Sequence, residues 1–492
     1  MELPTVIAQF DHVAGMHPRK PAIYWGSERV NYAQLQDHIR MHGANLQRIA
    51  NLQPGDRVGI LLKNSPQFIY VLYAALKSGA TVVPVNTFLK APEIQHIVDD
   101  CRLKYIVSDD EFTETTDKLQ RTSLVDARQL SHAHDAPPST LDVSSSAVAV
   151  IIYTSGTTGK SKGAMLTHDN IASNVRSCIK ALEETEDDRL TLLLPMFHSF
   201  MLTVCIFTPL SMGAGIVLIK SVQPFKLAIR ELIRNRATIL VGIPQLFQAM
   251  AQAKVPFWLP WVLKLRMAVS GAAPLPRETL DVFERKFRFP LLEGYGLSEA
   301  SPVVSFNPIR GVRKAGSVGL PLPDIEVKIV DDSGVERGVG MVGEIVVRGP
   351  NVMRGYYNQP GETAAALRGG WLHTGDMGKK DTDGYIYIVD RRKEMLLVRG
   401  MNVYPREIEE VLYTFPNVHE AAVVSRPDEK RGEAPIAFVS PNEGAELHSA
   451  EILRYCRERL ADYKIPRKIH IVKSLPRTAT GKIAKLELKK LL

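Results

Sequence analysis

The chain has 492 residues, of which 45% are hydrophobic and 23% are charged, as in ordinary soluble globular proteins. This length exceeds what one hydrophobic core usually supports, so we expect at least two domains. The net charge is +8, and residues 391–492 carry most of it, with 20 basic and 14 acidic side chains. A basic C-terminal part indicates a polyanionic partner. The chain shows no zinc-finger, recognition-helix or aromatic RNA-binding pattern, which argues against nucleic acid.

The N-terminal sequence lacks a basic start followed by a long apolar core, so we expect no secretory signal and a cytoplasmic location. Four cysteines lie far apart without metal-ligand spacing, which indicates buried thiols in a reducing compartment. Residues 199–219 carry no charge and could span a bilayer by length. Pro209 and the pair Gly213 and Gly215 divide this stretch, which favours a buried helix followed by a strand. Peripheral membrane contact and the oligomeric state stay open.

Strands and helices alternate in the first third of the chain. The pattern predicts strands at 57–62, 80–85 and 105–109 and helices at 65–79 and 91–101. Ser65 is the expected N-cap of the first of these helices, with Pro66 in its first turn. This order predicts a parallel sheet covered by helices. Residues 109–146 are mostly polar and predict connecting structure.

The pattern changes after Ile325. Segments 325–334, 343–349 and 384–390 alternate as antiparallel strands do. A new mixed unit follows Asp390, with strands at 420–425, 435–440 and 468–473 and with helices at 405–415 and 449–460, the last capped by Ser449. We therefore predict an α/β fold: a large N-terminal domain (1–390) with helix-covered sheets plus a small β-barrel, then a small mobile α+β C-terminal domain (391–492).

A glycine-rich stretch, "TSGTTGKSKG", follows an apolar strand at residues 154–163. A Walker loop requires glycine five residues before its Gly-Lys pair, and Thr154 occupies that place. Hydroxyls and successive backbone N–H groups can still hold phosphates, with Lys160 or Lys162 supplying charge. From these residues alone, a simple glycine-rich turn is an equal alternative.

Four further motifs follow in order: "GYGLSE" (294–299), "TGD" (374–376), "DRRKE" (390–394) and "PRTATGK" (476–482). With the glycine-rich stretch they make the chain resemble the adenylate-forming superfamily over nearly its whole length. That superfamily includes acyl-CoA synthetases, luciferases and adenylation domains. The resemblance implies that ATP and Mg²⁺ convert a carboxylic acid into an acyl adenylate, and that a thiol then displaces AMP.

The resemblance also implies site residues. Glu299 would bind Mg²⁺, with help from Thr154, and Asp376 would accept hydrogen bonds from the ribose hydroxyls. Tyr295 would lie against adenine, facing the backbone of the "GAAP" stretch. The other residues expected at the nucleotide are Ser155, Gly156, Thr157, Thr158, Gly159, Lys162, Gly271, Ala272, Ala273, Pro274, Gly294, Gly296, Leu297, Ser298 and Arg391.

Three more roles come from the resemblance. His198 would lie where the carboxylate meets the acyl pocket; amino-acid-activating relatives have Asp there, so an acid without an α-amino group is expected. Lys482 would reach the α-phosphate and carboxylate during adenylation. Lys393 would be the hinge that brings the stretch around Gly400 to the site for the thiol step.

The sequence leaves more than one alternative for the carboxylic acid that is activated and for the thiol that accepts the acyl group. Apolar residues after His198 and the stretch "VGIPQLF" (241–247) could line an acyl channel or be core. The motifs look most like medium- and long-chain fatty acid CoA ligases, with an aryl-CoA ligase as the alternative. CoA is favoured over a phosphopantetheinyl acyl carrier protein, because no extra segment lies between Asp390 and Tyr404. Leu397 replaces a lysine that many relatives use in the thioester step.

Overall fold

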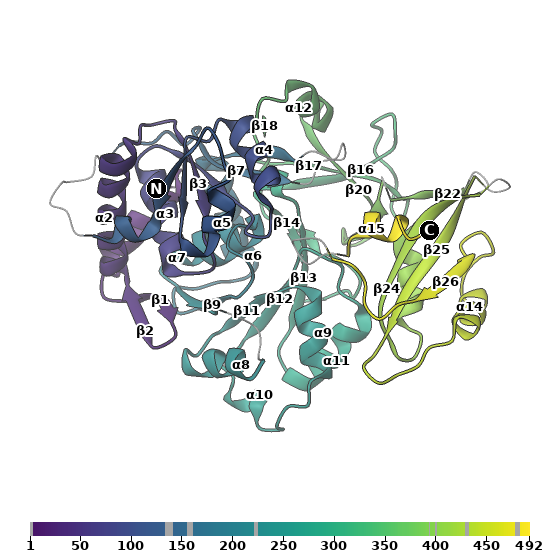
Figure 1. Cartoon of the computed structure of the whole chain (residues 1–492). Coiled ribbons are helices and arrows are strands. Elements are labelled where there is room, and N and C mark those ends of the chain that lie inside the picture. Colours follow the sequence, from purple (N-terminus) through teal and green to yellow (C-terminus); the bar gives the residue numbers. More distant parts are fainter. Residues whose placement is uncertain are drawn as a thin grey trace.

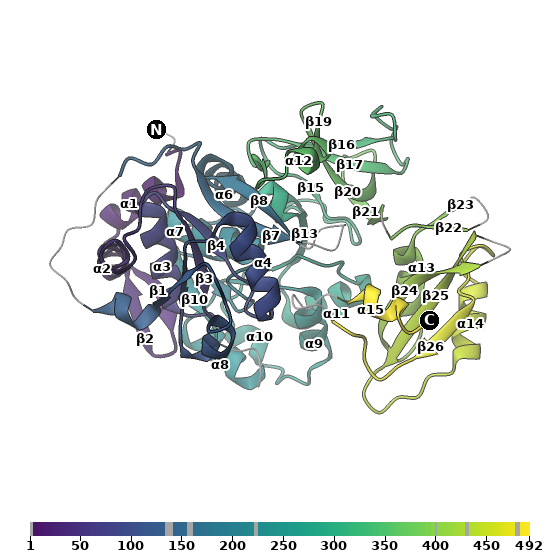
Figure 2. The ribbon, with the colours of Figure 1, turned by 45° about the horizontal axis from the view of Figure 1, so that its top comes forward.

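A computed structural model shows the arrangement of the chain (Figure 1) and describes residues 3–132, 141–154, 161–220, 225–392, 394–398, 401–428, 432–477 and 483–492. Two large sheets and a smaller one form the bulk of the molecule. A fourth sheet, formed by the last hundred residues, lies beside them in two views (Figures 1 and 2). The prediction of a mixed α/β fold with a large N-terminal and a small C-terminal part is confirmed.

The first large sheet has seven strands in the order β18-β8-β7-β4-β3-β5-β6. Its strands are β3 (Arg57–Leu61), β4 (Thr81–Pro84), β5 (Tyr105–Ser108), β6 (Ser123–Asp126), β7 (Val148–Thr154), β8 (Lys162–Thr167) and β18 (Gly355–Tyr356). The pairings of β3, β4, β5, β6 and β7 are parallel, which confirms the prediction for β3, β4 and β5. Strand β6 lies inside residues 109–146, so this stretch is not merely connecting structure.

The helices around this sheet include α2 (Tyr32–Ala50), α3 (Pro66–Lys77), α4 (Ala91–Cys101), α5 (Thr113–Thr116) and the short 3-10 turns η1 (Asp110–Phe112) and η2 (Ala127–Ser131). Ser65 is the N-cap of α3 by position, although its side chain makes no capping hydrogen bond. Every residue from Phe68 to Leu76 is buried. A helix buried on all sides belongs in the middle of a large core, between layers, rather than on a surface.

The second large sheet has nine strands in the order β15-β14-β13-β12-β11-β9-β10-β1-β2. Its strands are β1 (Pro21–Trp25), β2 (Glu28–Asn31), β9 (Arg189–Leu192), β10 (Gly215–Leu218), β11 (Ile239–Gly242), β12 (Met267–Ser270), β13 (Leu291–Gly296), β14 (Val303–Phe306) and β15 (Leu320–Pro321). Its helices are α1 (Val6–Met16), α6 (His168–Ala181), α7 (Thr208–Met212), α8 (Phe225–Arg234), α9 (Pro244–Gln252), α10 (Leu259–Val262) and α11 (Arg277–Phe287).

The uncharged stretch 199–219 belongs to this half of the molecule. It forms a π-helix, η3 (Met201–Phe207), which continues into α7 and then into strand β10. Gly213 ends α7 in the left-handed conformation that favours glycine. The predicted helix followed by a strand is therefore confirmed. Within the described ranges, no helix combines the length and the apolar character needed to cross a membrane.

The third sheet is antiparallel and contains β16 (Glu326–Val330), β17 (Gly343–Arg348), β19 (Leu367–Arg368), β20 (Trp371–Lys380) and β21 (Ile386–Arg391), with α12 (Pro360–Ala366) nearby. The hydrogen-bonded order is β16-β17-β20-β19, and β21 pairs with β20. Strand β16 pairs in this sheet only with β17. The strands are thus antiparallel as predicted, but in the described residues they form an open sheet rather than a closed barrel.

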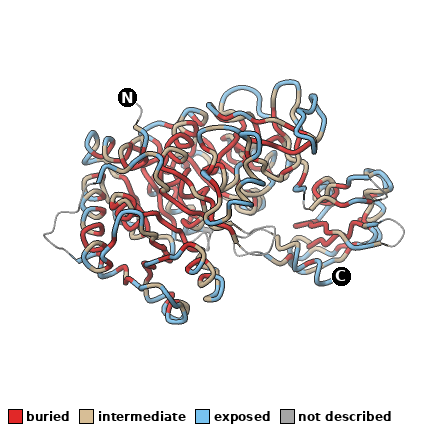
Figure 3. Tube along the Cα trace, turned by 90° about the horizontal axis from the view of Figure 1, so that it is seen from above, coloured by how far each residue is buried: buried red, intermediate tan, exposed pale blue. Residues whose placement is uncertain are grey.

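The C-terminal part has its own sheet and core. Its elements are β22 (Leu396–Val398), β23 (Met401–Val403), β24 (Val418–Asp428), β25 (Gly432–Pro441), β26 (Lys468–Ile471), α13 (Pro405–Tyr413), α14 (Ser449–Arg457) and α15 (Lys485–Lys489). Helix α14 begins at Ser449, so His448 is the N-cap and the predicted cap is wrong by one residue. Figure 3 shows a separate set of buried segments here, which correspond to a distinct apolar cluster.

A buried carboxyl group lies in the core of the large part. Glu184 is 6% exposed, and within the described residues neither of its carboxyl oxygens has a hydrogen-bond partner. Burial raises the pKa of Glu184 to about 8, with a further upward effect from Asp188 and a downward effect from Arg266. The side chain is therefore protonated at neutral pH, because an isolated buried charge costs more than holding the proton.

Glu184→Gln is expected to change how stability depends on pH. Between the unfolded pKa near 4.5 and the folded value near 8, the folded protein holds one more proton than the unfolded chain. The free energy of unfolding of the parent should therefore fall by about 1.4 kcal/mol per pH unit across this window. The glutamine variant lacks this slope, which denaturant unfolding at pH 5 and pH 8 would measure. Equal slopes in both proteins would contradict the burial argument, and the exposed neighbour Glu183→Gln is the matched control.

Candidate functional site

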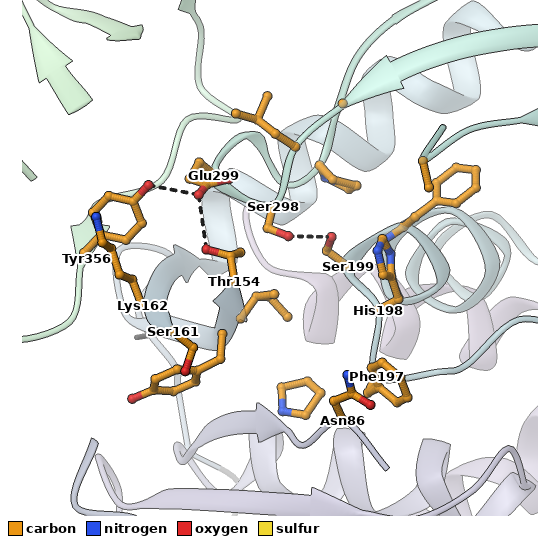
Figure 4. Close-up of a pocket in the computed structure, with 18 of the residues that line it drawn as sticks. Asn86, Thr154, Ser161, Lys162, Phe197, His198, Ser199, Ser298, Glu299 and Tyr356 are labelled. Atoms are coloured by element: carbon orange, nitrogen blue, oxygen red, sulfur yellow. Dashed lines mark hydrogen bonds between the residues drawn. The ribbon is translucent and has the colours of Figure 1, made fainter. Parts of the chain in front are cut away.

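A cleft of about 1260 Å³ opens between the sheets of the large part. Many of the predicted site residues line it: Thr154, Lys162, His198, Gly271, Ala272, Gly294, Tyr295, Gly296, Leu297, Ser298, Glu299 and Arg391. They come from β7, β8, β13, β21 and the segments that follow β9, β12 and β13. Residues far apart in sequence therefore meet in one cavity (Figure 4).

Some predicted residues lie outside the described ranges, and their roles stay predictions. They are Ser155, Gly156, Thr157, Thr158, Gly159, Lys393, Gly400 and Lys482. The residues that flank the glycine-rich stretch are described. Thr154 ends β7, Lys162 begins β8, and the two face each other across this antiparallel pair. The two described ends of the stretch therefore lie side by side in the sheet and line the cleft.

Glu299 is the centre of a small group of oxygen atoms. It lies in a 3-10 turn, η4 (Ser298–Ala300), just after strand β13. The hydroxyl of Tyr356 donates to Glu299 Oε1 over 2.9 Å, and the Thr154 hydroxyl approaches the same oxygen at 3.4 Å. Figure 4 shows both side chains directed at the carboxylate. Burial and the nearby carboxylate raise the pKa of Tyr356, so this phenol stays protonated as a donor.

This group fits a bound Mg²⁺. A carboxylate and hydroxyls supply only oxygen, which is the donor type that this hard cation prefers. Glu299 is half-buried and faces the cleft, so one side of it can still meet water and phosphate oxygens. Magnesium usually keeps several waters and takes one or two carboxylates together with substrate phosphates. When bound, the ion would neutralise charge on the phosphates of ATP.

Lys162 already has a partner. It is 7% exposed and forms an ion pair with Glu362 of α12, while its ammonium lies 5.5 Å from the centre of the Tyr356 ring. The prediction that Lys162 contacts phosphate therefore needs an exchange of partners. A phosphate would compete with Glu362 for one ammonium group, which is feasible because Glu362 is partly exposed to solvent.

Three residues that the resemblance assigns to the nucleotide form a chain of polar contacts. The hydroxyl of Tyr295 donates to Asp376 Oδ2 over 2.6 Å, and Arg391 Nε lies 3.0 Å from Asp376 Oδ1. Asp376 is buried, and its backbone N–H donates to the Thr374 hydroxyl. Burial and Asp376 raise the pKa of Tyr295 well above its usual range, so the phenol stays neutral. The motifs "GYG", "TGD" and "DRR" thus meet through side chains.

The glycines of "GYGLSE" permit close packing. A Cβ added to Gly296 would lie 2.2 Å from the carbonyl oxygen of Pro302, and one added to Gly294 would lie 2.2 Å from the ring of Phe306. Strand β14 therefore approaches β13 more closely than any side chain allows. This packing fixes the direction of Tyr295 and of Glu299, which lie on either side of Gly296 in the sequence.

His198 lies on the opposite side of the cleft from Lys162 and Tyr356 (Figure 4). A second cavity of about 40 Å³ adjoins it, lined by Leu194, Pro195, Phe197, His198, Phe200, Met201, Ile243, Gln245, Ala272 and Ala273. Ala272 adopts a positive φ of 68°, a strained conformation for a residue with a side chain. Pro274 lines neither cavity and is exposed, so only the first three residues of "GAAP" border them.

The carboxylate of Asp390 links the large part to the C-terminal part. Asp390 is buried in β21, where its Oδ1 accepts from the N–H of Arg391 over 2.7 Å. Its Oδ2 accepts from the N–H of Arg406, in the first turn of α13, over 3.0 Å. Burial raises the pKa of Asp390 to about 6. A second tie runs from Gln248 Nε2 of α9 to the carbonyl oxygen of His419.

Three residues of the site were missed from the sequence. Tyr356 and Glu362 reach the cleft because β18 pairs with β8, a contact between segments almost two hundred residues apart. No local sequence pattern predicts the pairing of β18 with β8. Gln245 lies in "VGIPQLF", whose apolar character predicted either a channel lining or core and gave no signal for the amide.

The cleft thus gathers the residues that the resemblance assigns to phosphate and Mg²⁺, and it adjoins a small apolar cavity, while the carboxylate predicted to bind ribose, Asp376, contacts its lining through Tyr295 and Arg391. Comparison with known proteins agrees. The AMP-binding enzyme family model matches residues 10–357, and the model of the C-terminal domain of that family matches residues 407–482. The chain belongs to the AMP-binding enzyme family.

Similar proteins include a feruloyl-CoA synthase from Amycolatopsis sp, 37% identical over 97% of each chain. A long-chain-fatty-acid–CoA ligase of Yersinia pestis is 34% identical over 99% of this chain and 94% of its own. The structure of the o-succinylbenzoate coenzyme A synthetase of Bacillus subtilis with ATP and a magnesium ion is similar, with a TM-score of 0.88 and 30% sequence identity. The match covers 98% of this chain and 99% of that chain. The chain is therefore an AMP-forming acyl-CoA synthetase that uses ATP, Mg²⁺ and CoA.

Proposed function

We propose that the acid that this enzyme joins to CoA is a compact aromatic carboxylic acid. The small cavity beside His198 carries this proposal. Its volume of about 40 Å³ is far below the roughly 300–1000 Å³ of ordinary ligand pockets. A ring whose carboxylate lies in the cleft would place only its distal edge there. A long alkyl chain would have to displace many more core residues, such as Met201 and Phe200, which are both buried.

The pocket also holds one polar atom that lacks a partner. Gln245 Oε1 is shielded from solvent and has no hydrogen-bond partner among the described residues. A buried polar atom of this kind is costly unless a ligand satisfies it. A phenolic hydroxyl on the far side of the ring is a donor of suitable chemistry. The relation to a feruloyl-CoA synthase supports the same class of acid.

A fatty acid is the second candidate. The relation to long-chain-fatty-acid–CoA ligases favours it, as do the apolar residues of the π-helix η3 behind the pocket. The two candidates separate in a steady-state assay of AMP release with CoA present. Hydroxylated aryl acids should give the highest kcat/KM, and a higher value for acids of twelve or more carbons would reject the aromatic proposal.

Gln245→Leu is expected to alter selectivity rather than to abolish activity. It should lower kcat/KM for a hydroxylated aryl acid by about tenfold to a hundredfold, because the hydroxyl loses its acceptor. The matching acid without a hydroxyl should be unaffected or improved. Gln252→Leu, at the exposed end of the same helix, is the control. An equal loss of kcat/KM for both acids would show that Gln245 supports the fold and does not bind the substrate hydroxyl.

A further inference from the structure

We propose that the tip formed by α10 and the residues just before it docks on an anionic lipid bilayer. The proposal rests on exposed apolar side chains, on the charge around them and on the way the fold supports them. It does not depend on which acid the enzyme activates.

Large apolar side chains are exposed together at this tip. Phe257 is 89% exposed, Trp261 is 68% exposed, Trp258 is 47% exposed and Val262 is 42% exposed. All four lie within six consecutive residues, which we call the α10 patch. Single exposed apolar residues are ordinary, but a contiguous set that includes two tryptophans marks an interaction surface.

The fold holds the α10 patch in place. Leu259 and Leu263 of the same segment are buried and belong to one apolar cluster with Phe247 of α9 and Leu232 of α8. Pro256 and Pro260 restrict the backbone on both sides of Trp258. The exposed rings are therefore the outward face of a supported turn, not a frayed end. Figures 1 and 2 place α10 beside α8 at the outer edge of this lobe.

The charge around the α10 patch is positive. Lys254 and Lys264 flank it and are exposed, and the guanidinium of the exposed Arg288 lies 4.7 Å from the centre of the Trp261 ring. The chain contains no Asp or Glu between residues 232 and 277, but six Lys and Arg. Exposed Lys226 and Leu227 on the neighbouring α8 extend the same combination of cation and apolar side chain.

An anionic bilayer matches this chemistry better than a protein surface does. Tryptophan prefers the region between lipid headgroups and acyl chains, where one end of its ring is apolar and the other is wet. Lysine and arginine beside it reach the phosphates of anionic lipids. Because the patch stands at an edge of the molecule and not in a groove, a flat and fluid surface can accept it without shape complementarity.

The test uses the full chain and sedimentation with vesicles. Phosphatidylcholine vesicles that contain about 30% phosphatidylglycerol should retain the protein, and pure phosphatidylcholine vesicles should retain much less. The double variant Phe257→Ser, Trp261→Ser should lower the partition coefficient about tenfold or more. Lys254→Glu with Lys264→Glu should lower it on anionic vesicles only. The matched control replaces two exposed valines elsewhere, Val312→Ser and Val335→Ser.

A second measurement locates the contact. Brominated lipids should quench the fluorescence of the parent, and Trp258→Phe with Trp261→Phe should remove this quenching, leaving Trp25 and Trp371 unquenched. Thermal unfolding and activity on a water-soluble acid should be the same in all variants, which excludes misfolding. The proposal is overturned if anionic vesicles do not bind the parent, if the valine control loses as much binding as the patch variant, or if the patch instead drives dimer formation without lipid.

Discussion

Glu299→Gln is expected to lower kcat/KM for acid-dependent ATP/pyrophosphate exchange by about a hundredfold or more. The carboxylate lies where the hydroxyls of Thr154, the last residue of β7, and Tyr356 converge. Glutamine keeps the size of the side chain but supplies a neutral oxygen and two N–H donors. It therefore removes the only formal negative charge in this group of three residues.

The decisive readout is the dependence on magnesium. The variant should need a higher Mg²⁺ concentration for half-maximal exchange, while thioester formation from supplied acyl adenylate should change much less. Tyr356→Phe removes one hydrogen bond to the carboxylate but keeps the charge, so it should cost less than Glu299→Gln, about tenfold. Glu336→Gln, at an exposed carboxylate between β16 and β17, should have no effect. An unchanged magnesium requirement in Glu299→Gln would reject the assigned role.

Lys482→Ala is expected to reduce acid-dependent ATP/pyrophosphate exchange by about a thousandfold while sparing thioester formation from supplied acyl adenylate. The expectation comes from the motif "PRTATGK", since Lys482 lies outside the described residues. A lysine that reaches the α-phosphate stabilises charge in the first reaction only. Lys473→Ala, an exposed lysine of the same basic region, is the control. Equal loss in both half-reactions would contradict a role confined to adenylation.

The resemblance carried by the ordered motifs predicted part of the site. Tyr295, Glu299 and Asp376 were assigned from this resemblance, and the structure brings them to one cleft or to direct contact with its lining. The parallel order of β3, β4 and β5 followed from alternating strands and helices, because a crossover helix between strands has few other arrangements. These features depend on residues close in sequence or on strong geometric rules.

Features that depend on distant pairing were not predictable in this way. Tyr356 reaches Glu299 only because β18 adds to the edge of β8, and the partner of Lys162 is two hundred residues away. Strand β6 was missed because its sequence is short and only Val125 is buried within it. The antiparallel strands were found, but whether their sheet closes depends on pairing between its edges, which alternation cannot reveal.

The hydrogen bonds of the Asp390 carboxylate affect the equilibrium between different orientations of the C-terminal part relative to the large part. Hydrogen bonds to a charged group are worth about 1.5–3 kcal/mol. An orientation that separates β21 from α13 loses the bond to Arg406 and would be disfavoured by about ten- to 150-fold on this account alone. A nucleotide or a thiol cofactor that binds the other orientation more tightly by a larger factor than this would make that orientation the majority state.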